Sequence, residues 1–155
     1  MRTMNLYLAG AIERSPDGGV GIREAVIEAF KDTDEVCLIN PCDFQYNKGT
    51  KSMWDYQHDK SHTFYECFSH AEKIGRGDVE AVLECDAILV LLDDKCGAGT
   101  ASECTLARYE GKPVLGLFLD PNRWRDVHPW IIGKVSAFFN SVEELKAYVL
   151  SLCRR

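Results

Sequence analysis

The sequence predicts an α/β fold in which an open, parallel five-stranded sheet carries helices on both faces. Unbroken apolar runs, of which Ala87 to Leu92 is the clearest, are typical of strands buried on both sides of a sheet. Segments of helical period lie between these runs along the whole chain, and this alternation indicates parallel strands joined by right-handed crossovers. No repeat or linker interrupts the chain, so a single domain over residues 1–155 is expected.

The first third of the chain predicts a strand, a loop, a helix and a second strand. Residues 4–9 are apolar almost throughout, which suits a central strand. Residues 10–21 form a loop punctuated by Gly and Pro, and the apolar residues from Ile22 to Phe30 recur with the period of an amphipathic helix. A short strand is expected at 36–39, whereas residues 43–60 show no clear period and are predicted to be irregular.

The middle of the chain predicts helix, strand and helix. The helical period that starts at Thr63 is interrupted by Gly75-Arg-Gly77, which predicts two helical pieces with a kink between them. The third strand, at 87–92, is followed by a glycine turn and by a helix of small residues that runs to Glu110. Gly111-Lys-Pro113 ends that helix.

The last third of the chain predicts two strands and a closing helix. The fourth strand is expected at 114–119 and the fifth at 135–139, with a connecting loop over 120–129. Ser141-Val-Glu-Glu144 matches a capping box and opens a final helix with one apolar face.

Composition excludes several classes of protein. The net charge of −6 argues against a general nucleic-acid binder and against a basic membrane-surface patch. No apolar stretch approaches the ~20 residues of a membrane span, and we expect no separate signal peptide before the first strand. Seven irregularly spaced cysteines without a C-x-x-C pair favour reduced thiols in a cytoplasmic protein. His58 and His62 lack the glutamate of an H-E-x-x-H zinc motif, so no metal is expected.

Acidic and glycine residues follow the third strand. Asp93 and Asp94 come directly after it, Gly97 and Gly99 form the turn, and Glu103 stands in the first part of the next helix. Because ligands of open α/β sheets bind at the carboxyl ends of the strands, these residues predict a ligand site.

The two glycine-containing loops match no nucleotide signature. The turn at Gly97 lacks the third glycine of G-x-G-x-x-G, and neither loop carries the G-K-[ST] of a P-loop. We therefore expect no dinucleotide cofactor and no NTPase activity. The loop with Gly19 still leads to a helix start, where free amides and Arg23 could contact a phosphate.

Several motifs together, in this order and spacing, resemble the nucleoside 2-deoxyribosyltransferases. They are Tyr7-Leu-Ala-Gly10, Gly77-Asp78, Asp86-Ala-Ile-Leu-Val-Leu, Gly99-Thr-Ala-Ser-Glu103 and Gly111-Lys-Pro-Val114. The resemblance covers residues 5–118 and implies the flavodoxin-like α/β fold that this family shares with the deoxynucleoside 5′-monophosphate N-glycosidases.

The resemblance implies a mechanism and a set of site residues. Glu103 matches the nucleophile that attacks the anomeric carbon, Asp78 the acid that protonates the departing base, and Tyr7 the tyrosine that orients the nucleophile. The sugar then passes to another nucleobase without any cofactor. The remaining candidates are expected to bind substrate: Gly10, Gly19, Arg23, Asp93, Asp94, Gly97, Gly99 and Thr100. The family's enzymes are commonly homo-oligomers whose sites a neighbouring chain completes, which implies an oligomer here.

The sequence departs from the family at two places. Gly97 stands nearest to the position of a substrate-binding aspartate, so Asp93 or Asp94 could substitute for it. Cys104 follows Glu103 where the family often has glycine.

Plainer interpretations of the three main residues remain open. Thr100 and Glu103 fit a capping box, Asp78 fits a helix N-cap, and Tyr7 fits a core tyrosine. Two other functions also remain: hydrolysis of a (deoxy)nucleoside 5′-monophosphate, and nucleotide sensing without catalysis.

Overall fold

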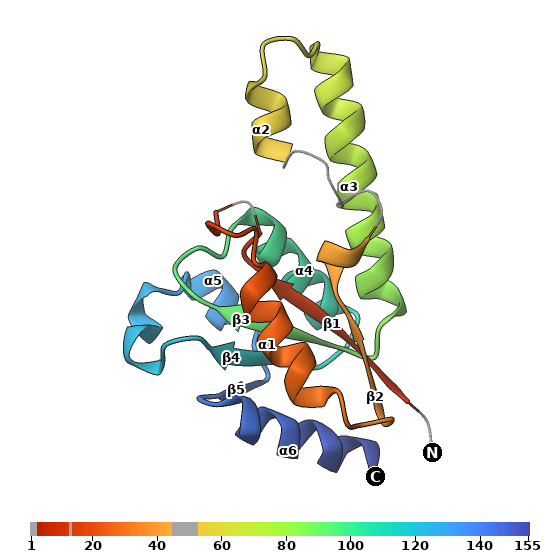
Figure 1. The fold of residues 1–155 in the computed structure, drawn as a ribbon, viewed down its shortest axis with the longest axis vertical. Coiled ribbons are helices and arrows are strands. Elements are labelled where there is room, and N and C mark those ends of the chain that lie inside the picture. Colours follow the sequence, from red (N-terminus) through yellow and green to blue (C-terminus); the bar gives the residue numbers. More distant parts are fainter. Residues whose placement is uncertain (1–2, 13, 45–52) are drawn as a thin grey trace.

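The computed structural model describes residues 3–12, 14–44 and 53–155 and confirms the predicted fold class. Five parallel strands form one open sheet in the order β2-β1-β3-β4-β5 (Figure 1). The strands are β1 (Met4–Gly10), β2 (Val36–Ile39), β3 (Ala87–Leu92), β4 (Val114–Phe118) and β5 (Ala137–Phe139). The expected fifth strand is two residues shorter at its start, because residues 133–136 form the turn that follows a short helix.

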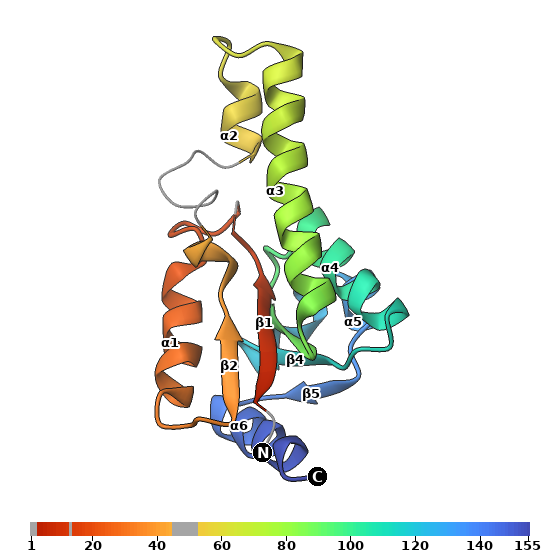
Figure 2. The same cartoon turned by 90° about the vertical axis from the view of Figure 1, so that its right-hand side faces the viewer.

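Helices cover both faces of the sheet (Figure 2). One face carries α1 (Val20–Phe30) and α6 (Val142–Cys153), and the other carries α3 (Phe64–Glu84), α4 (Ala98–Tyr109) and α5 (Pro129–Ile132). Three further helical segments are η1 (Pro41–Asp43), α2 (Met53–His58) and η2 (Pro121–Asp126). Within the described residues, no helix has both the length and the apolar character that crossing a membrane requires.

Side chains of the central strands alternate between two cores. Leu8 and Leu89 are paired across β1 and β3 and both face α1 and α6. Tyr7 and Ile88, the pair one residue earlier, both face α3, α4 and α5. This alternation follows from the two-residue period of a strand. It places Tyr7 on the same side of the sheet as α4.

The predicted kink at Gly75 is wrong. Helix α3 runs without a break from Phe64 to Glu84, and a capping box between Thr63 and Glu66 fixes its start. A glycine in a helix costs only about 1 kcal/mol and removes no hydrogen-bond donor, so packing along the helix can offset it. The first half of α3 and the neighbouring α2 extend beyond the carboxyl ends of the strands (Figures 1 and 2).

Two segments that were expected to be irregular contain helices. Helix α2 lies within the segment 43–60, of which residues 45–52 lie outside the described residues. Its Tyr56 ring stacks between the rings of His62 and His70, with centroid separations of 3.7 and 4.1 Å. Helices η2 and α5 lie between β4 and β5.

Candidate active site

The centre of the candidate site is a hydrogen bond between Tyr7 and Glu103. The Tyr7 hydroxyl donates to Oε1 of Glu103 at 2.7 Å. Tyr7 is fully buried on β1, and Glu103 comes from α4, which packs on that face of the sheet. The buried Cys104 and Ala107 of α4 have small side chains, which let the helix approach the sheet closely. A glycine after Glu103 is therefore not required for this packing.

Helix α4 does not begin with the capping box that Thr100 and Glu103 could have formed. Its N-cap is Gly97, without a hydrogen bond from a side chain, and its first helical residue is Ala98. Thr100 is buried in the first turn, and Glu103 lies one turn further on with its carboxyl bonded to Tyr7. The structure contradicts the cap interpretation, because residues 98–100 are already helical. Gly99 likewise lies inside the helix and not in the turn before it.

The surroundings of Glu103 control its proton affinity. Burial of the carboxyl raises the pKa of Glu103 to about 8 from an ordinary value of 4.5. The hydrogen bond from Tyr7 lowers the pKa of Glu103, the negative charge of Asp78 raises it, and the positive charge of Arg23 lowers it. The residue as a whole is only partly buried, but the carboxyl itself is enclosed by protein atoms, and this enclosure determines the direction of the shift.

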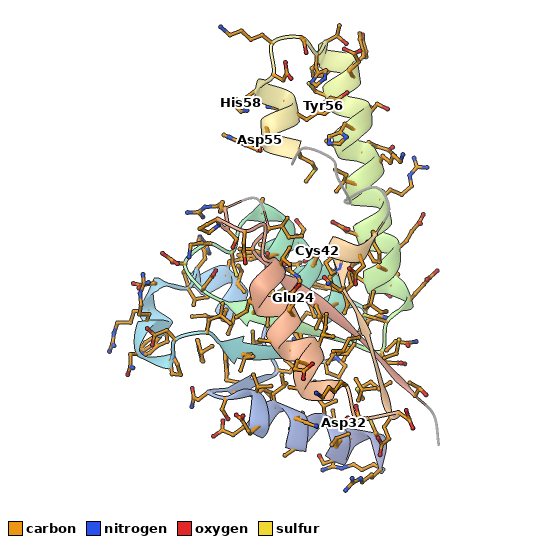
Figure 3. All side chains as sticks on the ribbon, in the orientation of Figure 1. Glu24, Asp32, Cys42, Asp55, Tyr56 and His58 are labelled. Atoms are coloured by element: carbon orange, nitrogen blue, oxygen red, sulfur yellow. The ribbon has the colours of Figure 1, made fainter. Side chains whose placement is uncertain are left out.

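Asp78 approaches the site from α3. It lies in the interior of this helix and not at a helix start, so the N-cap interpretation of Asp78 is wrong. Its charge acts on Glu103 and also on the thiol of Cys42 in η1. Burial raises the pKa of Cys42, Arg23 lowers it, and Asp43, Asp17 and Asp78 raise it (Figure 3 labels Cys42). The charges of Asp78 and Arg23 thus act on both Glu103 and Cys42.

Arg23 lies in the first turn of α1, and its guanidinium is bonded to the loop between β1 and α1. Its side chain is fully buried. The guanidinium donates to four backbone carbonyls, those of Leu8, Gly10, Ala11 and Gly19, at 2.9–3.4 Å. Contact of this guanidinium with a phosphate stays a prediction. The structure shows a buried cation that holds this loop through its carbonyls and whose charge acts on Glu103.

Gly19 is required by this arrangement. Its φ is 73°, and a Cβ at this position would lie 2.2 Å from the Ala11 oxygen and 2.2 Å from Arg23 Nη1. Gly10 also lies against the guanidinium, because its Cβ position is 3.6 Å from Arg23 Nη2. Both glycines thus act through the fit of Arg23, and substrate binding by either stays a prediction.

Sequence reasoning missed Arg14. This exposed side chain brings its Cδ within 4.0 Å of the Cβ position of Gly97. The loop after β1 therefore meets the start of α4 at the carboxyl edge of the sheet. The signal was present in the sequence, since Arg14 is the only basic residue between Gly10 and Gly19.

The two aspartates after β3 have different surroundings. Oδ1 of Asp93 accepts from the amides of Lys95 and Cys96 at 2.8 and 3.1 Å, which shapes the turn into α4. Asp94 pairs with Arg123 at 3.4 Å and with Lys95 at 3.8 Å. Both aspartates line a cavity of about 170 Å³ between the ends of β3 and β4. Their contact with a substrate stays a prediction.

Among residues 3–12, 14–44 and 53–155, no three His, Cys, Asp or Glu side chains form a group that could hold a metal ion.

Comparisons with known proteins show that solved structures share the fold of this chain. No protein-family model and no curated protein matches the sequence. A conserved protein from Enterococcus faecalis V583 superposes with a TM-score of 0.60 at 20% identity, over 92% of this chain and 94% of that one. A 2-desoxiribosyltransferase from Leishmania mexicana gives a TM-score of 0.51 at 24% identity, over 76% of this chain and 65% of that one. The CMP N-glycosidase BcmB of Clostridium botulinum gives 0.46 at 16% identity, over 97% and 99%. The first two solved structures have the fold of this chain.

Proposed function

We propose that this protein is a nucleoside 2′-deoxyribosyltransferase. It would cleave the N-glycosidic bond of a 2′-deoxynucleoside and transfer the sugar to another nucleobase. The observation that supports this most directly is the 2.7 Å hydrogen bond from Tyr7 to Glu103, with Asp78 in electrostatic reach of the same carboxyl. A carboxylate oriented by a phenol and accompanied by a second carboxyl is the arrangement that two-step glycosyl transfer requires.

The first step forms a covalent ester. Tyr7 holds Oε1 of Glu103, so we assign the attack on the anomeric carbon to Oε2. The bond from this carbon to the base nitrogen breaks, its electron pair goes to the base, and Asp78 supplies the proton. In the second step the acceptor base attacks the same carbon, releases Glu103 as a carboxylate and returns its proton to Asp78.

The charges around the site fit this division of roles. The step requires an ionised Glu103 beside a protonated Asp78. Since the negative charge of Asp78 raises the pKa of Glu103, a proton on Asp78 removes that repulsion. The hydrogen bond from Tyr7 and the charge of Arg23 both favour the ionised form of Glu103.

Base exchange tests the proposal. The protein is incubated with a 2′-deoxynucleoside and a second nucleobase, and the swapped nucleoside is measured by chromatography. Glu103→Ala should abolish exchange, whereas Glu110→Ala, at the exposed end of the same helix, should leave it unchanged. Mass spectrometry of the quenched reaction should find one deoxyribosyl group on the peptide with Glu103. Exchange by Glu103→Ala, or a sugar ester on Asp78, would contradict the assigned roles.

One observation favours a hydrolase acting on a 5′-monophosphate as the second candidate. Arg14 is an exposed cation beside Gly97, where the amides of the first turn of α4 begin. The same incubation with a deoxynucleoside 5′-monophosphate separates the candidates, because free sugar phosphate indicates the hydrolase and a swapped base the transferase. Tight binding without any product would indicate a sensing domain.

A further inference from the structure

The start of α1 already holds an anion, and that anion belongs to the chain itself. Oδ1 of Asp17 accepts from the Ser15 hydroxyl at 3.0 Å and from the Gly19 amide at 2.9 Å. Its Oδ2 accepts from the Gly21 amide, also at 2.9 Å. An ordinary helix cap would come from the N-cap residue, but this is Gly19, which has no side chain. The carboxylate comes from two residues earlier and occupies the position of an external anion at a helix start.

The chain is shaped to seat this carboxylate. A Cβ at Gly21 would lie 2.9 Å from Oδ2 of Asp17, so the close approach of the two residues requires a glycine there. The hydrogen bonds from Gly21, Ser15 and Gly19, of which the first has the largest effect, lower the pKa of Asp17 from its ordinary value of 3.8. The exposed Asp17 is therefore ionised at neutral pH.

The loop that carries Asp17 leaves the sheet next to the turn that leads to Glu103. Strands β1 and β3 are neighbours, and Gly10 at the end of β1 pairs with Leu91 of β3. Arg14 of this loop lies against Gly97, the N-cap of α4, with its Cδ 4.0 Å from the Cβ position of that glycine. The loop and the start of the helix of Glu103 therefore meet at the carboxyl edge of the sheet.

We propose that Asp17 determines which donors this protein accepts, because its carboxylate takes the place that a 5′-phosphate would need at the start of α1. The inference rests on the proposed function and names its substrate class, a 2′-deoxynucleoside with a free 5′-hydroxyl. In this arrangement the 5′ end of the sugar bound at Glu103 points to the loop of Asp17. A phosphate there would find the amides of Gly19 and Gly21 already bonded and would meet a like charge.

A comparison of two donors tests the proposal. kcat/KM is measured for a 2′-deoxynucleoside and for its 5′-monophosphate, and both a swapped base and free sugar phosphate are counted as product. Wild type should prefer the nucleoside by at least about tenfold, since like charges across a binding site suppress the wrong partner. Asp17→Asn removes the charge but keeps a side chain suited to a helix start, so it should reduce this preference by at least about tenfold. Asp17→Ser also frees the Gly21 amide and should reduce it further.

Asp32→Asn is the matched control for the loss of one negative charge. Asp32 is exposed and follows the other end of α1, where Figure 3 labels it. This variant should keep the donor preference of wild type. Circular dichroism and thermal melting of all variants check that each is folded.

Binding of inorganic phosphate tests the role of Asp17 without turnover. In a phosphorus NMR titration, Asp17→Ser should bind phosphate at least about tenfold more tightly than wild type and Asp32→Asn. If none of the proteins turns over any donor, the proposed function fails, and this titration still decides whether Asp17 keeps phosphate out. Equal donor preferences in wild type and both Asp17 variants, or equal phosphate affinities of wild type and Asp17→Ser, would overturn the proposal. A wild type that uses the 5′-monophosphate better than the nucleoside would also overturn it.

Discussion

Replacing Tyr7 by phenylalanine removes one hydroxyl group and one hydrogen bond to Glu103. The bond is 2.7 Å long, and its acceptor is a carboxyl whose pKa is about 8. A hydrogen bond to an ionised group contributes about 1.5–3 kcal/mol. Since one pKa unit corresponds to about 1.36 kcal/mol, its loss should raise the pKa of Glu103 by one to two units.

The expected effect is a shift of the acidic limb of the pH–rate profile toward higher pH. At pH 7, a pKa of about 8 leaves roughly one tenth of Glu103 ionised, and an increase of one to two units leaves roughly one hundredth to one thousandth. Base exchange at pH 7 should therefore fall about 10- to 100-fold.

The assay is kcat/KM for the donor nucleoside across the pH range, because this ratio reports groups of the free enzyme. Tyr109→Phe is the matched control, since Tyr109 is an exposed tyrosine on the same helix as Glu103. An acidic limb at the same pH in wild type and Tyr7→Phe would refute the reasoning. Tyr7 would then contribute only to packing.

Three further predictions concern stability. Glu103→Gln should gain about 4–5 kcal/mol of stability relative to wild type between pH 4 and pH 9, because the raised pKa of Glu103 favours the folded state below pH 4.5 and this contribution is lost as the pH rises to about 8. Thermal melting of both proteins at the two pH values checks it. Arg23→Met should lower the free energy of unfolding, measured in urea, by at least about 3 kcal/mol, because it leaves four backbone carbonyls without their donor. The control Arg125→Met replaces an exposed side chain and should change this free energy by less than about 0.5 kcal/mol. Gly19→Ala should lower the free energy of unfolding by more than about 3 kcal/mol, and Gly18→Ala by only about 1–2 kcal/mol. Both glycines have a positive φ, but only a Cβ at Gly19 would overlap other atoms. Equal midpoints of urea unfolding for the two variants would contradict this difference.

The sequence predicts best those elements whose side chains are all buried. β3 was predicted to the residue, because all six of its side chains are buried and its ends are polar. The kink predicted in α3 is wrong because local preference, and not burial, was its basis. The glycines carry only a local preference, and contacts with the sheet and with α2 hold the helix straight through them.

The candidate site was only partly accessible from the sequence. The motifs that resemble a known family predict Tyr7 and Glu103 as site residues, and the structure places these two side chains in contact. The inward turn of Arg23 could not be predicted, because it depends on how the loop from Gly10 to Gly19 folds over the guanidinium. No period or spacing in the sequence encodes that fold.

The hydrogen bond between Tyr7 and Glu103 also bears on the pairing register of β1 in the sheet. Its two residues are 96 positions apart, and Tyr7 lies on the strand between β2 and β3. If β1 paired with a slip of one residue, Leu8 would face α4 and Tyr7 would enter the aliphatic core under α1. The carboxyl of Glu103 would then be enclosed without its phenolic donor, at a cost of several kcal/mol. The same bond that would orient a nucleophile therefore also selects the correct strand register during folding.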